Sequence, residues 1–184
     1  MSSIVLFNKP YGVLSQFSGD GSVPTLANFI DIPQVYPAGR LDKDSEGLML
    51  LTDDGKLQQK ISDPRFNKIK TYLVQIDGSV TASAIQQLEE GVELKDGLTL
   101  PAIVKAIPEP DLWARSPPVR FRKNIPTSWV ELSIREGRNR QIRRMTAAVG
   151  FPTLRLVRTG VAEWQLGDLQ PGHWRQLEAG SLNL

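Results

Sequence analysis

The segment from Gly39 to Gly47 (GRLDKDSEG) carries three carboxylates and two cations directly before the apolar run at residues 48–52. Catalytic and binding side chains are common on loops that a rigid element positions. An Asp in such a loop, with an ordinary pKa of about 3.9, is ionised and could act as a nucleophile, a base or a ligand. The same residues would also suit a polar surface loop whose Asp and Ser side chains bond to their own turn. Composition alone leaves both interpretations open.

Arginines are concentrated in a second segment, residues 135–145 (REGRNRQIRRM). We expect a helix over residues 139–149, which would place Arg140, Arg143 and Arg144 on one face because side chains three and four positions apart are neighbours. Guanidinium groups at a helix N-terminus favour a bound phosphate or carboxylate. The alternative, an exposed basic helix face, is less favourable because clustered like charges repel one another when no anion is present.

Residues 113–158 carry eleven basic and two acidic side chains, a net charge of +9 in a chain whose total is +2. Ten of the eleven are arginines, whose planar guanidinium matches phosphate oxygens in pairs and stacks on bases. A nucleic acid or another polyanion is therefore the expected partner, with a solvated basic surface as the alternative. Part of this charge lies in a Pro- and Arg-rich stretch, residues 108–127, that is too long for a tight hairpin and is expected to form a surface insertion.

Several classes of protein are excluded by composition. The chain has no cysteine and a single histidine, His173, which excludes disulfide scaffolds, thiolate zinc sites and multi-histidine metal sites. We therefore expect no metal. The apolar runs are far shorter than the ~18 residues of a spanning helix, and the N-terminus lacks a basic segment followed by a long apolar one. A soluble, cytoplasmic protein without membrane contact is the expectation.

The order of expected elements indicates the fold class. Helices are expected at residues 25–29, 56–61, 81–90 and 139–149, with Thr81 as an N-cap and Gly91 as a terminator. Apolar and β-branched runs predict strands at residues 4–7, 13–15, 48–52, 70–76, 98–107, 128–134, 154–157, 163–166 and 173–177. Strands outnumber helices without a regular βαβ alternation, which predicts an α+β fold on a mostly antiparallel mixed sheet. At ~150 residues per domain, the length suggests one domain, residues 1–184.

Four blocks of the chain, taken in order, resemble the small-subunit rRNA type of pseudouridine synthase. The blocks are Asn8-Lys9-Pro10-x-Gly12, Gly39-Arg40-Leu41-Asp42-x-Asp44-Ser45-x-Gly47-Leu48, Lys70-Thr71-Tyr72 and Glu136-Gly137-Arg138-Asn139-Arg140-Gln141-Ile142-Arg143-Arg144-Met145. The resemblance extends from Ile4 to about Leu177 and is closest to members that act on the large ribosomal subunit. It implies a two-lobed catalytic domain with a central cleft. Many relatives carry an additional S4-type RNA-binding domain, and we expect none here, so that RNA affinity would come from the catalytic domain.

The resemblance also implies roles for single residues. Asp42 would be the catalytic aspartate, Tyr72 the active-site tyrosine and Arg143 the cation paired with Asp42. Isomerisation of uridine breaks the N1–C1′ bond and joins C5 to C1′ without a change of redox state, so no cofactor is expected. Asp42 would either add to C1′ or abstract the C2′ proton. The remaining arginines are expected to bind substrate RNA: Arg40 beside the catalytic loop, and Arg115, Arg120, Arg122, Arg138, Arg140 and Arg144.

The expected partner is 23S rRNA, either naked or in a large-subunit assembly intermediate, bound by a monomer. Two other functions would also use some of these residues. A glycosidase or N-glycosylase would use Asp42, Asp44 and Glu46, but it normally needs two carboxylates facing each other across the substrate, which successive loop residues rarely do. A non-catalytic RNA-binding module would explain the arginines but leave residues 39–47, the acidic loop, without a role. The sequence also lacks the interleaved aromatic residues of an RRM-like surface.

Overall fold

The computed structural model describes residues 2–178, which divide into two compact units. The first unit comprises residues 2–68 and 158–178, and the second comprises residues 69–157. Strand β9 (Thr153–Val161) therefore begins in the second unit and ends in the first. No helix in this part of the chain is long and apolar enough to cross a membrane.

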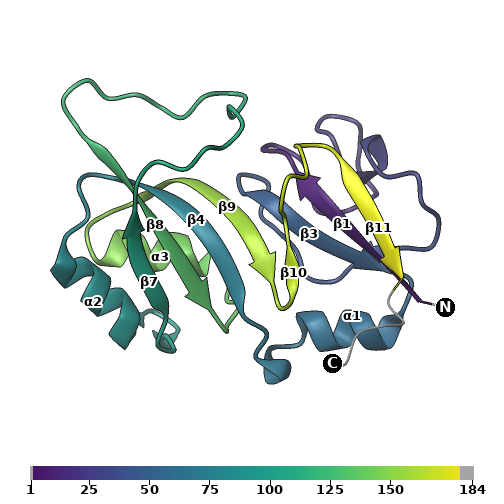
Figure 1. Cartoon of the computed structure of the whole chain (residues 1–184), viewed down its shortest axis with the longest axis horizontal. Coiled ribbons are helices and arrows are strands. Elements are labelled where there is room, and N and C mark those ends of the chain that lie inside the picture. The colour runs from purple at the N-terminus through teal and green to yellow at the C-terminus, as the bar shows by residue number, and fades with distance from the viewer. Residues whose placement is uncertain (1, 179–184) are drawn as a thin grey trace. The chain divides into compact units, whose positions relative to one another are not determined.

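The sheet of the first unit is built around β1 (Ser3–Lys9). β1 pairs antiparallel with β11 (Trp174–Glu178) on one side and with β3 (Glu46–Thr52) on the other (Figure 1). The two-residue strand β2 (Tyr36–Pro37) pairs with β3, and β10 (Trp164–Gln165) pairs with the end of β9. All seven residues of β3 are buried: the apolar residues 48–51, and also Glu46, Gly47 and Thr52 at the two ends of the strand.

Side-chain caps position the helical segments of the first unit. Asp54 accepts hydrogen bonds from the first backbone N–H groups of α1 (Gly55–Ser62), and Asp63 does the same for the 3₁₀ turn η2 (Pro64–Phe66). Thr25 forms a capping box with the 3₁₀ turn η1 (Leu26–Asn28). These short polar side chains satisfy N–H groups that have no partner within the helix.

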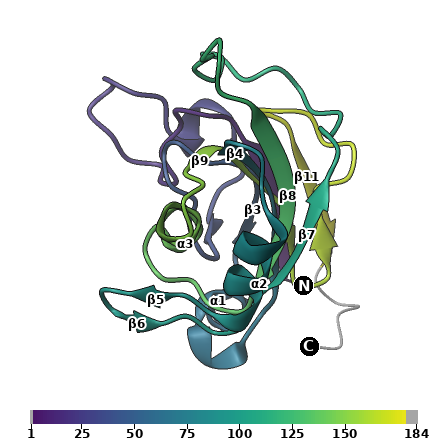
Figure 2. The same ribbon diagram turned by 90° about the vertical axis from the view of Figure 1, so that its left-hand side faces the viewer.

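In the second unit, β8 (Thr127–Ile134) pairs antiparallel with both β4 (Lys70–Asp77) and β7 (Ile103–Ile107). Helices α2 (Ala82–Glu90) and α3 (Gln141–Ala148) lie on one face of these strands (Figure 2). Alternate residues of β4 are buried, beginning with Tyr72, as a strand with one covered face requires.

Two connections of the second unit carry residues discussed below. The hairpin of β5 (Glu93–Leu94) and β6 (Gly97–Leu98) follows α2. Residues 108–126 connect β7 to β8 without a helix or strand and form the long loop at the top of Figure 1.

The predicted α+β class with a mostly antiparallel sheet is confirmed. Some boundaries were wrong. Residues 13–15 form no strand, and Leu14 makes only an isolated bridge to Thr25. The strand expected at residues 98–107 is interrupted, so that β6 and β7 are separate. Helix α3 begins at Gln141 rather than near Asn139, because Arg140 has a left-handed backbone (φ 52°) that no α-helix accommodates.

Candidate active site

The loop that carries Asp42 connects β2 to β3 and is held by hydrogen bonds on both sides of that residue. The Ser15 hydroxyl donates to the Leu41 carbonyl over 2.5 Å and accepts from the Leu41 N–H over 3.1 Å. On the other side, the Lys43 carbonyl accepts from the Gly12 N–H over 2.8 Å. The backbone around Asp42 is thus fixed, while its side chain is half-buried and keeps access to solvent.

Lys9 is a fully buried cation beside the same loop. Its Nζ donates to the carbonyls of Pro10 and Val13, each over 2.9 Å, and to that of Lys43 over 3.3 Å. Burial lowers the pKa of Lys9 from 10.5 to about 8. Neighbouring charges act in both directions: three carboxylates raise the pKa and one guanidinium lowers it, in the order Glu46, Asp44, Asp42 and Arg158. The Lys9 ammonium, at the end of β1, therefore links the turn that follows this strand to the acidic loop through hydrogen bonds.

Sequence reasoning included Lys9 only as one member of a motif and missed its contact with the acidic loop. The available signal was a lysine placed directly between an apolar strand and a Pro-containing turn. A cation in that position cannot reach solvent without leaving the strand, so it must find partners nearby.

Gly47 fixes the point where the acidic loop becomes strand β3. Its φ of +106° favours glycine, and a Cβ there would collide with the carbonyl oxygen of Arg158 in β9. Arg158 is itself buried and donates from Nε to the Leu48 carbonyl over 2.8 Å. β3 and the end of β9 therefore approach closely just beyond the loop, which limits how the loop can move.

Tyr72 lies on β4 in the second unit and is 8 % exposed. Its cross-strand partner is Leu132 of β8, which is in turn paired with Val104 of β7. Both partners are buried and apolar. The tyrosine ring is therefore held by a packed sheet rather than by a loop.

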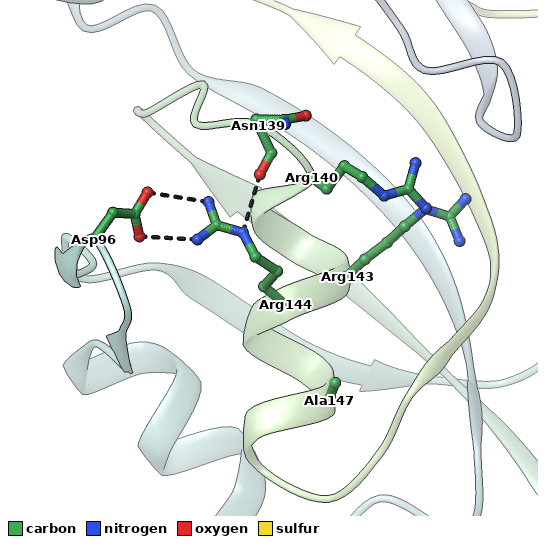
Figure 3. Close-up of a pocket in the computed structure, with 6 residues that line it drawn as sticks. All are labelled: Asp96, Asn139, Arg140, Arg143, Arg144 and Ala147. Carbon is green, nitrogen blue, oxygen red and sulfur yellow. Dashed lines mark hydrogen bonds and ion pairs between the residues drawn. The ribbon is translucent and has the colours of Figure 1, made fainter.

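Three of the predicted arginines line one pocket at the start of α3. The pocket has a volume of about 520 Å³ and is lined by Asp96, Asn139, Arg140, Arg143, Arg144 and Ala147. Figure 3 shows Arg140 and Arg143 extending together, while Arg144 points to the opposite side, toward Asp96. The three arginines thus line one pocket, but only Arg140 and Arg143 extend to the same side, and the expected convergence of all three on one face is not what the structure shows.

Asp96, in the β5–β6 hairpin, forms a bidentate ion pair with Arg144, with N–O distances of 2.8 and 3.2 Å. The hydrogen bonds from Arg144 hold the pKa of Asp96 below its ordinary value. Sequence reasoning missed Asp96, since nothing in a Lys-Asp-Gly turn signals contact with a residue 48 positions later.

Two arginines assigned to RNA binding instead make extensive contacts within the protein. Arg138 donates to Glu136 over 3.0 Å and to the carbonyls of Gly97 and Leu98 over 3.0 and 2.8 Å. Arg115 donates to carbonyls of its own loop, those of Pro117 and Pro118, and to that of Leu154. Their guanidinium groups brace the β5–β6 hairpin and the 108–126 loop, and their role toward RNA stays a prediction.

The other predicted residues are distributed over both units. Arg40 is exposed on the acidic loop of the first unit, which also carries Asp42. Arg120 and Arg122 lie on the 108–126 loop of the second unit, and Arg122 forms an ion pair with Asp77 over 3.3 Å. Within residues 2–178, no group of three or more His, Asp or Glu side chains is arranged to hold a metal ion.

Residues 3–148 match the family model of RNA pseudouridylate synthases. The chain therefore belongs to the RNA pseudouridylate synthase family, and the function class indicated by its motifs, an RNA-modifying isomerase, is confirmed.

Its relatives include two proteins named ribosomal large subunit pseudouridine synthase E. The one from Vibrio parahaemolyticus is 56% identical over 175 residues, which covers 95% of this chain and 74% of the relative. The one from Xanthomonas campestris pv. campestris is 58% identical over 175 residues, covering 94% of both chains. A crystal structure of a pseudouridylate synthase, 30% identical, superposes with a TM-score of 0.80 over 97% of this chain and 71% of that one.

Proposed function

We propose that this protein isomerises one specific uridine of 23S rRNA to pseudouridine, as a monomer in the cytoplasm. The observation that carries the proposal is the identity of 56% and 58%, over almost the whole chain, to proteins named for the large ribosomal subunit. The concentration of arginines in residues 113–158 supports a polyanionic substrate. The substrate is naked 23S rRNA or a large-subunit assembly intermediate.

In the proposed reaction Asp42 is the catalytic residue. It acts on the ribose, either by adding to C1′ or by taking the C2′ proton, while the N1–C1′ bond breaks. The uracil then turns, C5 bonds to C1′, and the C5 proton is lost as N1 gains one, so atoms and electrons balance without a cofactor. The hydrogen bonds at Leu41 and Lys43 support this role, because a catalytic carboxylate must be held in its reacting position.

Tyr72 and Arg143 complete the proposed machinery. Tyr72 stacks on the target base and assists proton removal at C5. Arg143 pairs with Asp42, which keeps the carboxylate ionised, since an opposite charge within ~4–6 Å lowers a carboxyl pKa by about 1–3 units. The sequence motifs shared with the family support both assignments.

The proposed RNA contacts are electrostatic. Arg140 and Arg144 are among the residues that line the pocket at the start of α3, where they could bind a phosphate, and Arg40, Arg120 and Arg122 contribute further positive charge. The target nucleotide has to be flipped out of the RNA, at a cost of a few kcal/mol that binding contacts must offset. Arg115 and Arg138 contribute through the loop and hairpin that they brace.

The proposal is tested by mapping pseudouridine in total RNA from cells with and without this protein, by carbodiimide adduct formation and primer extension. One 23S rRNA stop should disappear without the protein and return with the wild type. Asp42→Asn should not restore it, although the variant still binds RNA. Asp44→Asn is the matched control from the same loop and should retain substantial activity. Release of free uracil instead of pseudouridine would indicate an N-glycosylase.

A further inference from the structure

Phe121 is the most exposed large hydrophobic side chain among residues 2–178. It is 87 % exposed, against 64 % for the next, Ile103. It lies in the second half of the 108–126 loop, between Arg120 on one side and Arg122 and Lys123 on the other. No acidic residue occurs between positions 112 and 130. An isolated aromatic ring in a strongly basic surface calls for a partner that is both negatively charged and able to stack.

The first half of the loop that carries Phe121 is held by contacts with β9. Arg155 of β9 donates from Nη2 to the Trp113 carbonyl over 2.8 Å, and its guanidinium carbon lies 5.7 Å from the centre of the Trp113 ring. Arg115 donates to the Leu154 carbonyl over 3.3 Å. These contacts tie the first half of the loop to β9.

The second half of the loop is held by a hydrogen bond and an ion pair at the end of β4. The Gly78 N–H donates to the Pro126 carbonyl over 2.7 Å, and Arg122 pairs with Asp77 over 3.3 Å. Because both ends are held, the segment that carries Phe121 has fewer conformations open to it. These contacts therefore reduce the free-energy cost of ordering the loop when a partner binds.

A hollow of about 510 Å³ adjoins the ring. It is lined by residues 119–127 together with Gln75 of β4, and its charged members are Arg120, Arg122 and Lys123. Gln75 and Tyr72 are three positions apart on β4, so their side chains lie on opposite faces of the sheet. The hollow is therefore separate from the face on which Tyr72 lies.

We propose that Phe121 stacks on an unpaired base of the substrate RNA outside the catalytic pocket, with Arg120 and Lys123 binding the adjoining phosphates. The inference rests on the proposed function, since it takes RNA as the substrate. Aromatic rings accept any base by stacking, and basic side chains beside them follow the backbone, which is how unpaired RNA is usually bound. A duplex would not offer a free base face to the ring, so the occupant is a loop, bulge or end near the target.

The test measures binding of overlapping 23S rRNA transcripts to wild type and to Phe121→Ala, Phe121→Trp and Phe121→Leu. On the transcript that wild type binds most tightly, the alanine variant should bind about 5- to 100-fold more weakly, the range expected for loss of one stacked base. Tryptophan should restore the affinity and leucine should not. The matched control is Phe66→Ala, which removes a 46 % exposed phenylalanine from the first unit and should bind like wild type.

A second measurement identifies the stacked nucleotide. Abasic sites are placed one at a time in the unpaired positions of the same transcript, and affinities are compared in a double-mutant cycle with Phe121→Ala. One abasic position should weaken binding by wild type but have no further effect on the alanine variant. Additive effects at every position would overturn the inference.

Other outcomes separate this inference from the proposed function. Normal RNA binding by Phe121→Ala, or restoration by leucine as complete as by tryptophan, would overturn base stacking, and the second result would indicate that apolar bulk at this position supports RNA binding without a stacked ring. Neither bears on whether the enzyme isomerises 23S rRNA. Conversely, a wild type that binds rRNA transcripts through Phe121 but leaves every 23S uridine unmodified would contradict the proposed function alone.

Discussion

At the scale of the residue, Asp42 of the acidic loop and Lys9 of β1 are two charged groups in different surroundings. Asp42 is half-buried on the loop, whereas Lys9 is completely buried behind it and donates to three backbone carbonyls. A buried ammonium with satisfied hydrogen bonds is tolerated, but its desolvation still has a free-energy cost. That cost depends on protonation and can therefore be measured through pH.

Lys9 should make the stability of the first unit rise with pH above about 8. Its pKa is about 8 in the folded protein, against an ordinary value of 10.5, so between these limits the unfolded chain binds more protons and the free energy of unfolding increases with pH. Below pH 8 the ammonium is charged in both states and its burial cost is fully present. Urea unfolding at pH 7, 8, 9 and 10 should show that the free energy of unfolding of wild type increases with pH relative to that of Lys9→Met. Lys60→Met, which changes an exposed lysine, is the control and should show no such trend.

Arg143 should differ from the other arginines in its effect on catalysis. If it pairs with Asp42, Arg143→Ala should lower the single-turnover rate at saturating enzyme by about 100-fold or more, as loss of a preorganised charge contact does. Arg143→Lys should recover part of this rate, because it restores the charge without the planar guanidinium. Arg120→Ala should weaken RNA binding and be rescued by higher enzyme concentration. A normal saturated rate for Arg143→Ala would assign Arg143 to phosphate binding instead.

At the scale of the element, the junction of the acidic loop with β3 depends on one glycine. Gly47→Ala would place a Cβ against the Arg158 carbonyl at a positive φ, so we expect a loss of several kcal/mol in stability or an insoluble protein. Gly55→Ala, in the first turn of α1 with no atom near its added Cβ, is the control and should change stability by less than about 1 kcal/mol. Chemical unfolding of both variants checks this. Unchanged stability of Gly47→Ala would mean that β3 and β9 can separate at this point.

The elements that the sequence predicted well are those with long apolar patterns or clear caps. β3 and β8, and α2 with Thr81 as its N-cap, lie close to their predicted positions. The two-residue strands β2 and β5 were missed, since so short a segment has no measurable periodicity. The left-handed backbone at Arg140 was also unpredictable, because that conformation is set by tertiary packing in a residue that usually avoids it.

The candidate site was predicted in its residue types but not in its contacts. The concentration of basic residues led to the prediction that Arg138 and Arg115 bind RNA. Only the structure shows that both also donate to backbone carbonyls of the protein. The link from Lys9 to Lys43 spans 34 positions and leaves no local trace in the sequence. Whether a cation faces solvent or the protein interior depends on such distant contacts.

At the scale of the whole molecule, charge is divided between the two units. From the sequence, residues 69–157 carry a net charge of +4, and the rest of the chain carries −2. The second unit is therefore expected to supply most of the phosphate contacts, and counterion release should make RNA affinity fall steeply with salt.

Salt dependence can assign individual phosphate contacts. For single-stranded RNA, each neutralised phosphate contributes about 0.7 to the slope of log affinity against log salt. Arg120→Ala and Arg140→Ala should each reduce the slope by roughly that amount. Arg65→Ala is the control, since it removes an exposed arginine of the first unit that is paired with Asp63. Equal slopes for all four proteins would place the RNA contacts elsewhere.

The pairing of β1 with β11 has a consequence for how the protein is made. Ser3 pairs with Glu178, so one edge of β1 has no partner until residue 178 has been translated, roughly 10–35 s later at ordinary rates of synthesis. Residues 69–157 are contiguous and are all synthesised before that strand. Meanwhile the nascent first unit has an open sheet edge that invites pairing with other chains. If the arginines and Asp42 act as proposed, a chain terminated before β11 would keep the 108–126 loop and the pocket at the start of α3 but lack the strand that pairs with β1, and it would bind RNA without modifying it.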